Sequence, residues 1–90
     1  MVAPLDYRVT DEFVQAYEAL DDDTAFAVDR AIARLLEDHT SAWARQGRVA
    51  GEHGDAWILE FRTRHADVSL YWNYLDDHLI LLVILLAHPG

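Results

Sequence analysis

The sequence predicts an α+β domain in which a two-helix hairpin packs on one face of a four-stranded, mainly antiparallel sheet. Three observations predict this class. A short strand candidate precedes two segments whose apolar residues recur at helical spacing. A glycine-containing, irregular stretch follows at 39–55, and the apolar and aromatic residues of 56–88 then favour three consecutive strands. Half of the 90 residues are apolar, so we expect 1–90 to form a single domain with one core.

The first helix is predicted to follow directly on the strand at 7–10. Thr10 or Asp11 can cap it, and acidic residues in its first turn suit the positive end of the helix dipole. Residues at i, i+4 and i+7 give the helix one apolar stripe, which consists of Phe13, Tyr17 and Leu20.

The second helix is predicted to begin after a turn at 21–24, which also supplies its N-cap. Its apolar stripe has the same spacing, at Val28, Ile32 and Leu35. The short link between the two helices is typical of an αα-hairpin.

The strands of 56–88 allow each side chain to be assigned to a face. If Asp76 and Asp77 form a two-residue turn, alternate residues on both sides of it share one face. We expect the helices to cover Trp57, Leu59, Phe61, Leu70, Trp72, Tyr74, Leu79, Leu81 and Val83. The opposite face then carries Ile58, Glu60, Arg62, Ser69, Tyr71, Asn73, Ile80, Leu82, Ile84 and Leu86.

The last strand is apolar on both faces, which predicts a central position between the first strand and the strand before it. The apolar residues on its uncovered face need a cover, which is a partner, a second copy of the chain or the chain's own tail. We expect a partner interface formed by Ile80, Leu82, Ile84 and Leu86.

Composition excludes several classes of function. The chain has no cysteine, hence no disulfide framework and no thiolate metal site. Its first residues lack the basic and apolar regions of a signal peptide, and the apolar run 79–87 is too short to span a membrane, so a cytoplasmic protein is expected. The net charge of −9 argues against broad, non-specific binding to nucleic acid.

The charged residues are biased in kind. All seven cationic residues are Arg, and Asp makes up most of the sixteen acids. A genome of high GC content favours Arg over Lys, whereas a salt-rich cytoplasm favours surface Asp. We favour the second interpretation, a halophile, because GC content alone does not explain so many acids. In molar salt the Debye length falls to about 3 Å, and net charge then says little about partners.

The whole chain resembles the RelE/ParE superfamily of type II toxin–antitoxin toxins. The resemblance rests on the order strand, helix, helix, loop and three-stranded meander. It also rests on five segments: 7–10 with Phe13, 31–35, Trp57-x-Leu-Glu60-x-Arg62, Leu70-Tyr71-Trp72-x-Tyr74-x-Asp76-Asp77, and 85–88. These segments are a pattern of strands and aromatic residues rather than a catalytic signature.

The resemblance implies a toxin that inhibits translation by ribosome-dependent mRNA cleavage and is held by a cognate antitoxin. Its partners are then the antitoxin, the ribosome and mRNA, with a homodimer or a hetero-oligomer with the antitoxin as assemblies, and no membrane. Two alternatives stay open. One is a non-enzymatic, ParE-like inhibitor of a protein target such as DNA gyrase, and the other is a degenerate member that only binds its antitoxin.

Carried over to this sequence, the resemblance implies an endoribonuclease site formed by His88 as acid, Glu60 as base and Arg62 as phosphate ligand. Ser69 stands near the position where many relatives have Arg, and lysine is absent. RNA-binding residues are expected among Arg48, Arg64, His65, Tyr71 and Asn73.

The ordinary roles of these residues compete with the functional ones. A pair such as Glu60 and Arg62 is more often a salt bridge on an exposed sheet face than a catalytic pair, and a histidine near a chain end is more often exposed and inert. Tyr71 and Asn73 are more often packing residues in a strand than ligands of a base. His53, His65 and His78 lack ligand spacing, so no metal site and no cofactor are expected.

Overall fold

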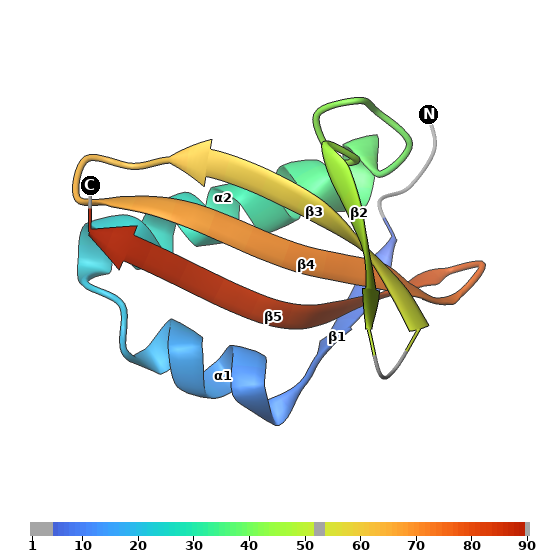
Figure 1. Cartoon of the computed structure of the whole chain (residues 1–90), viewed down its shortest axis with the longest axis horizontal. Helices are drawn as coiled ribbons and strands as arrows, with labels where there is room; N and C mark the ends of the chain where they lie inside the picture. Colours follow the sequence, from blue (N-terminus) through green and yellow to red (C-terminus); the bar gives the residue numbers. More distant parts are fainter. Residues whose placement is uncertain (1–4, 52–53, 90) are drawn as a thin grey trace.

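Two helices and five strands make up the computed structural model, which describes residues 5–51 and 54–89. Their bounds are β1 (Asp6–Val9), α1 (Asp11–Glu18), α2 (Asp22–Asp38), β2 (Gly47–Gly51), β3 (Gly54–Arg62), β4 (Ala66–Asp76) and β5 (Leu79–Pro89). The α+β class with two helices is therefore confirmed (Figure 1).

The sheet has the strand order β1-β5-β4-β3-β2. The prediction of four strands is wrong, because β2 adds a fifth. The sheet is also mixed: β1 runs parallel to β5, while the other neighbouring pairs are antiparallel. The central position predicted for the last strand is confirmed, since β5 lies between β1 and β4.

Both helices begin at a side-chain cap. The hydroxyl of Thr10 accepts a hydrogen bond from the backbone N–H of Phe13 at 3.1 Å, and the carboxylate of Asp21 accepts one from the backbone N–H of Thr24 at 3.2 Å. Each cap satisfies a donor that the first turn of a helix leaves without a partner. Of the two caps that the sequence allows, Thr10 is therefore the one used, and Asp11 is the first residue of α1.

The core lies between the helices and one face of the sheet. The predicted stripe of α2 is buried there, as is Phe13 of α1, and Trp57, Phe61 and Tyr74 pack partly buried against the same cluster. Trp72 is fully buried and donates its indole N–H to the carbonyl oxygen of Ala44 at 2.8 Å. This bond fixes the loop between α2 and β2 onto the core.

The face predicted for the first half of β5 is wrong. Ile80 and Leu82 are fully buried in the core rather than on the opposite face, because they lie directly opposite Tyr74 and Trp72. The turn occupies Asp77 and His78, one residue later than predicted, and Asp76 pairs with Leu79.

Two irregularities in the β4–β5 pairing explain this result. One lies between the pairs made by Tyr74 and Asp76, and the other between those made by Tyr71 and Trp72. A one-residue offset moves side chains to the other face of a sheet, so residues between the irregularities change face. After the second irregularity, the side chains of β5 lie on the predicted faces again. Ile84 and Leu86 are each 40% exposed on the face that the helices do not cover.

Within 5–51 and 54–89, neither helix has the length and apolar character needed to cross a membrane.

Candidate functional site

The sheet face opposite the helices, here called the outer face, holds the three predicted catalytic residues. Cross-strand partners share a face of the sheet, and Asp67 pairs with Arg62 of β3 on one side and with His88 of β5 on the other. The next row consists of Glu60, Ser69 and Leu86. The predicted acid, base and phosphate ligand therefore lie at the same end of the outer face.

The spacing of these residues follows from strand geometry. Adjacent strands lie about 4.8 Å apart, so the backbones of β3 and β5 are separated by about 10 Å across β4. Glu60 and His88 thus stand on opposite sides of Ser69 and Asp67. Glu60, Arg62 and His88 are all exposed, so the row is open to solvent.

Asp67 is the residue at this row that the sequence analysis missed. Its carboxylate accepts a hydrogen bond from the Nε of Arg62 at 2.8 Å, so the predicted Glu60–Arg62 pair is replaced by an Arg62–Asp67 pair. The only feature of the sequence that indicates the Arg62–Asp67 pair is the short turn between β3 and β4. This turn sets the register that brings Asp67 opposite Arg62.

The two arginines on the strands of the outer face, Arg8 and Arg62, each form an ion pair with an aspartate. Arg8 pairs with Asp6 of the same strand at 3.4 Å, and Arg62 pairs with Asp67 of the neighbouring strand. The pKa of Asp6 is held below its usual value, chiefly by a hydrogen bond from the backbone N–H of Tyr7 and then by Arg8. Both Arg side chains are more than half exposed, so these pairs contribute little to stability.

The residues predicted to bind RNA divide between the two faces. Tyr71 and Asn73 lie on the outer face, where Tyr71 pairs with Ile58 and Ile84. Asn73 uses its side-chain amide to donate to the carbonyl oxygen of Asp55, which fixes the start of β3. Arg64 is exposed in the turn between β3 and β4.

Arg48 and His65 lie away from the outer face. Arg48 pairs across the strands with Trp57, and Trp57 pairs with the buried Trp72, which places Arg48 on the helix side of the sheet. Its guanidinium stacks 4.7 Å from the Trp57 ring and pairs with Asp55 at 3.0 Å. These two side chains therefore do not lie beside Tyr71 and Asn73 on the outer face, and their role in RNA binding stays a prediction.

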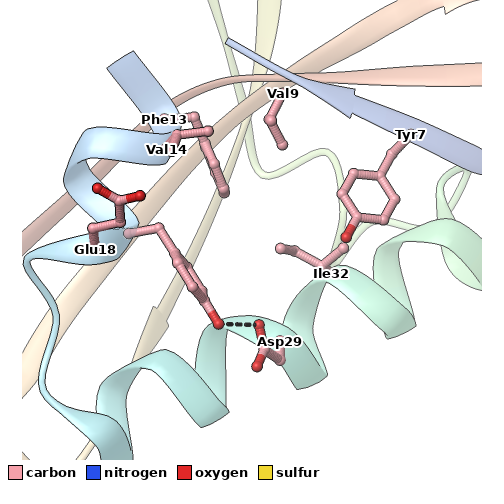
Figure 2. A pocket seen from close by; sticks show the side chains of 8 residues that line it. Tyr7, Val9, Phe13, Val14, Glu18, Asp29 and Ile32 are labelled. Carbon is pink, nitrogen blue, oxygen red and sulfur yellow. Dashed lines mark hydrogen bonds between the residues drawn. The ribbon is translucent and has the colours of Figure 1, made fainter. Parts of the chain in front are cut away.

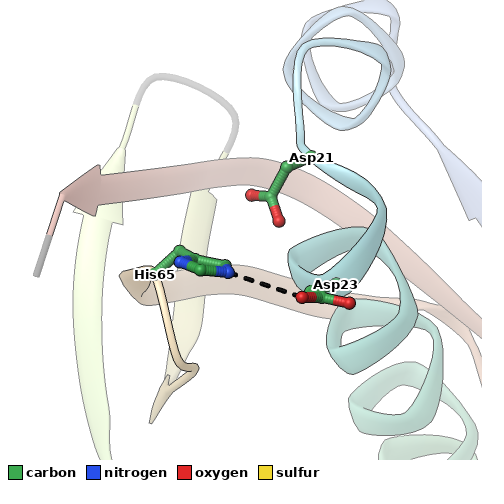
Figure 3. A group of neighbouring side chains, drawn as sticks. All are labelled: Asp21, Asp23 and His65. Atoms are coloured by element: carbon green, nitrogen blue, oxygen red, sulfur yellow. Dashed lines mark ion pairs between the residues drawn. The ribbon is translucent and has the colours of Figure 1, made fainter.

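His65 instead points towards the start of α2, as Figure 3 shows. Its Nε2 lies 3.4 Å from the carboxylate of Asp23, and Asp21 lies beside this pair. The three side chains offer potential ligand atoms within 4.8 Å of one another, and all three are exposed.

The capping role of Asp21 explains this cluster without a metal. Both of its carboxylate oxygens already accept from Thr24, one from the hydroxyl at 2.6 Å and the other from the backbone N–H. The side-chain bond from Thr24 is also the main reason why the pKa of Asp21 lies below its usual value. A helix N-terminus favours anions over cations. We assign no metal to the cluster, and the expectation of no metal site stays a prediction.

A second group of cationic and aromatic side chains, around Arg45, has a structural explanation. The guanidinium of Arg45 donates to the phenol oxygen of Tyr74 at 2.7 Å and to the carbonyl oxygen of His39 at 3.0 Å. It also lies 4.9 Å from the centre of the Trp57 ring. The His39 ring completes the group by hydrogen-bonding the same phenol through Nδ1 at 2.7 Å. These bonds tie the loop after α2 to the sheet.

An apolar groove crosses the other end of the outer face. It has a volume of about 410 Å³, and it forms because β2 and the start of β3 cross over the sheet (Figure 1). The hairpin contributes Val49 and Ala56, while Tyr71, Val83 and Ile84 come from β4 and β5. Thr10 and Glu12, at the start of α1, line the remaining side. The groove is large enough to receive side chains of another chain.

Comparison with known proteins adds no family: the chain matches no family model, and neither a curated protein nor a solved structure is significantly similar to it.

Proposed function

We propose that this chain is a RelE/ParE-like toxin that inhibits translation by cleaving mRNA on the ribosome, and that a cognate antitoxin holds it inactive. The observation that carries the proposal is the presence of Glu60, Arg62 and His88 at one end of a single open sheet face. The order of the elements, with a strand and two helices before a meander, supports the same family. We also propose that the chain has the RelE/ParE-like variant of the α+β fold.

The proposed reaction divides among these three side chains. Glu60 takes the proton from an RNA 2′-hydroxyl, whose oxygen attacks the neighbouring phosphorus. Arg62 stabilises the negative charge that develops on the phosphoryl oxygens. His88 gives a proton to the leaving 5′-oxygen, so the products are a 2′,3′-cyclic phosphate and a free 5′-hydroxyl.

Asp67 opposes this scheme while it is bound to Arg62. As an anion paired with the guanidinium, it competes with the incoming phosphate. Asp67 is also the cross-strand partner of His88, so the two residues share the outer face. Replacing Asp67 by Asn keeps the shape of the side chain and removes its charge, so Arg62 becomes free to bind phosphate.

The test is growth and protein synthesis in cells that express the chain with single substitutions. His88→Ala and Arg62→Ala are expected to abolish toxicity while leaving antitoxin binding intact. Matched controls are His78→Ala, in the β4–β5 turn, and Arg30→Ala, on the exposed side of α2. If toxicity is unchanged in both site variants, the nuclease proposal is refuted.

A second candidate function, inhibition or binding without chemistry, is favoured by the charge of the outer face. Its strand cations Arg8 and Arg62 are each paired with Asp, and the neighbouring groove is apolar, which suits a protein better than RNA. Growth arrest with protein synthesis intact would indicate a gyrase-type inhibitor. Absence of arrest under salt conditions in which the chain folds would indicate an antitoxin-binding module.

The antitoxin is proposed to cover the apolar part of the outer face. Ile84 lines the groove, and Leu86 continues the same exposed strip along β5. Leu86→Glu is therefore expected to weaken antitoxin binding without unfolding the chain. Undiminished affinity of this variant would mean that the partner binds elsewhere.

A further inference from the structure

A pocket on the helix side of the molecule is unrelated to the outer face. It has a volume of about 330 Å³ and opens at the sheet edge formed by β1, between α1 and α2 (Figure 2). This volume lies at the lower end of the range of about 300–1,000 Å³ found for small-molecule sites. The eight lining residues are Tyr7, Val9, Phe13, Val14, Tyr17, Glu18, Asp29 and Ile32.

Aromatic side chains from two different elements line this pocket. Tyr7 reaches in from β1, and Phe13 and Tyr17 come from α1. Ile32 of α2 contributes apolar surface beneath them, as Figure 2 shows. Phe13 and Ile32 are buried, whereas Tyr7 is 38% exposed, so the aromatic surface can be reached from solvent.

The charged groups of the pocket are all negative. Two carboxylates line it, those of Glu18 and Asp29, and none of the eight lining residues is a Lys, Arg or His. The phenol of Tyr17 donates a hydrogen bond to Asp29 at 2.8 Å, which holds the carboxylate at the pocket (Figure 2). This bond is also the main reason why the pKa of Tyr17 is raised, so the phenol stays neutral near neutral pH.

These features together select one chemical class of ligand. Carboxylates repel an anion, and a bare metal ion prefers a closed set of oxygen ligands to aromatic walls. A cation with an apolar surface satisfies both parts of the lining, because the face of an aromatic ring attracts an ammonium group within about 6 Å. Clusters of aromatic side chains are one means by which proteins recognise quaternary ammonium groups.

We propose that this pocket binds an organic ammonium cation of about the size of choline, with its methyl groups against Tyr7, Phe13 and Tyr17 and its charge facing Asp29 and Glu18. The same group can come from a free solute or from a methylated lysine side chain of another protein. The proposal is independent of the function proposed for the outer face. No residue of this pocket is one of the proposed catalytic residues Glu60, Arg62 and His88, and none lines the apolar groove.

The first experiment is a titration followed by the NMR signals of Tyr7, Val9 and Val14 at constant ionic strength. The probes are choline and its uncharged carbon isostere, 3,3-dimethylbutan-1-ol. Choline is expected to shift these signals with saturation and to bind about tenfold or more tightly than the alcohol, the ratio that corresponds to about 1.4 kcal/mol of cation–π and charge attraction. Equal affinities, or no saturable shift with choline, would overturn the proposal.

Single substitutions then assign the affinity to particular groups. Tyr7→Leu and Asp29→Asn should each weaken choline binding by about tenfold while the alcohol binds as before. Phe26→Leu is the matched control, since Phe26 is an aromatic residue of α2 that is 64% exposed and lies outside the pocket. A similar loss in Phe26→Leu, or full affinity in both pocket variants, would contradict the assignment.

A peptide that contains trimethyllysine, compared with its unmodified twin, distinguishes the two sources of the cation. If the methylated peptide displaces choline at concentrations below those at which choline itself binds, the result would support a partner side chain as the ligand. Displacement only at a similar or higher concentration would support a free solute. Displacement by the unmodified peptide at equal concentration would contradict recognition of the methyl groups.

Discussion

The assignment of β5 residues to faces can be tested with a pair of leucines that the sequence pattern treats as equivalent. Leu82 is fully buried opposite Trp72, whereas Leu86 is 40% exposed on the outer face. Leu82→Ala removes three carbon atoms from a packed site and leaves a cavity. Substitutions of this kind cost about 2–5 kcal/mol. Leu86→Ala loses only part of the burial of one side chain, which we expect to cost less than about 1 kcal/mol.

These free energies convert into large differences in melting temperature. A change of 1 kcal/mol shifts the midpoint by about 4–8 °C in a domain of this size, so a cost of about 3 kcal/mol lowers it by about 12–24 °C. Such a cost is also a large fraction of the total stability of about 5–15 kcal/mol that is usual for a domain. The difference between the two variants should therefore be obvious in a single experiment.

The assay is equilibrium unfolding in denaturant, followed by circular dichroism at a fixed salt concentration, with a thermal scan in parallel. Both variants should keep the wild-type dependence on denaturant, so that the shift in midpoint reports stability alone. Equal costs for the two substitutions, or a larger cost for Leu86→Ala, would refute the faces described for β5.

The remaining predictions concern the cap, the core and the hairpin. Trp72→Phe leaves the carbonyl of Ala44 without its indole donor and should lower the free energy of unfolding by about 1–3 kcal/mol, as measured in denaturant; no loss would mean that this bond is dispensable. Gly54 has a positive φ of 98°, so Gly54→Ala should cost about 1–2 kcal/mol, while Gly51→Ala, which lacks that constraint, should cost less. The pKa of Asp21 is lower in the folded chain than its ordinary value of 3.8. The ionised carboxylate therefore stabilises the fold fully above that ordinary value, and this stabilisation is lost as the pH falls through the pKa of the folded state. Asp21→Asn should keep the cap but weaken this acid dependence, and an unchanged pH profile of unfolding would contradict the role given to its charge.

The parts of the fold that depend on local chemistry could be predicted from the sequence. Thr10 is a strong N-cap residue, and the stripe Val28, Ile32 and Leu35 has helical spacing, so both helices were found. The strand β2 was missed because Gly47 and Gly51 bound it, and a short glycine-rich segment shows no alternation of apolar and polar residues. Its pairing with β3 is a tertiary effect.

The faces of β5 could not be predicted because every one of its side chains from Leu79 to Ala87 is apolar. Alternation carries no information in such a strand, and two pairing irregularities then decide which residues are buried. The candidate site shows the same limit. Glu60 and Arg62 were expected on one face, whereas His88 was assigned to no face and joins them only because β5 extends to Pro89. The partner of Arg62 is Asp67, which only the register between β3 and β4 reveals.

The most direct test of the central claim, that the outer face cleaves mRNA on the ribosome, is cell-free translation with the purified chain at a salt concentration in which it is folded. Primer extension would map the 5′ ends of the translated message. We predict new 5′ ends within the coding region only while ribosomes translate it, their loss with His88→Ala, and their persistence with His78→Ala. An intact message in the presence of the folded wild-type chain would contradict the claim.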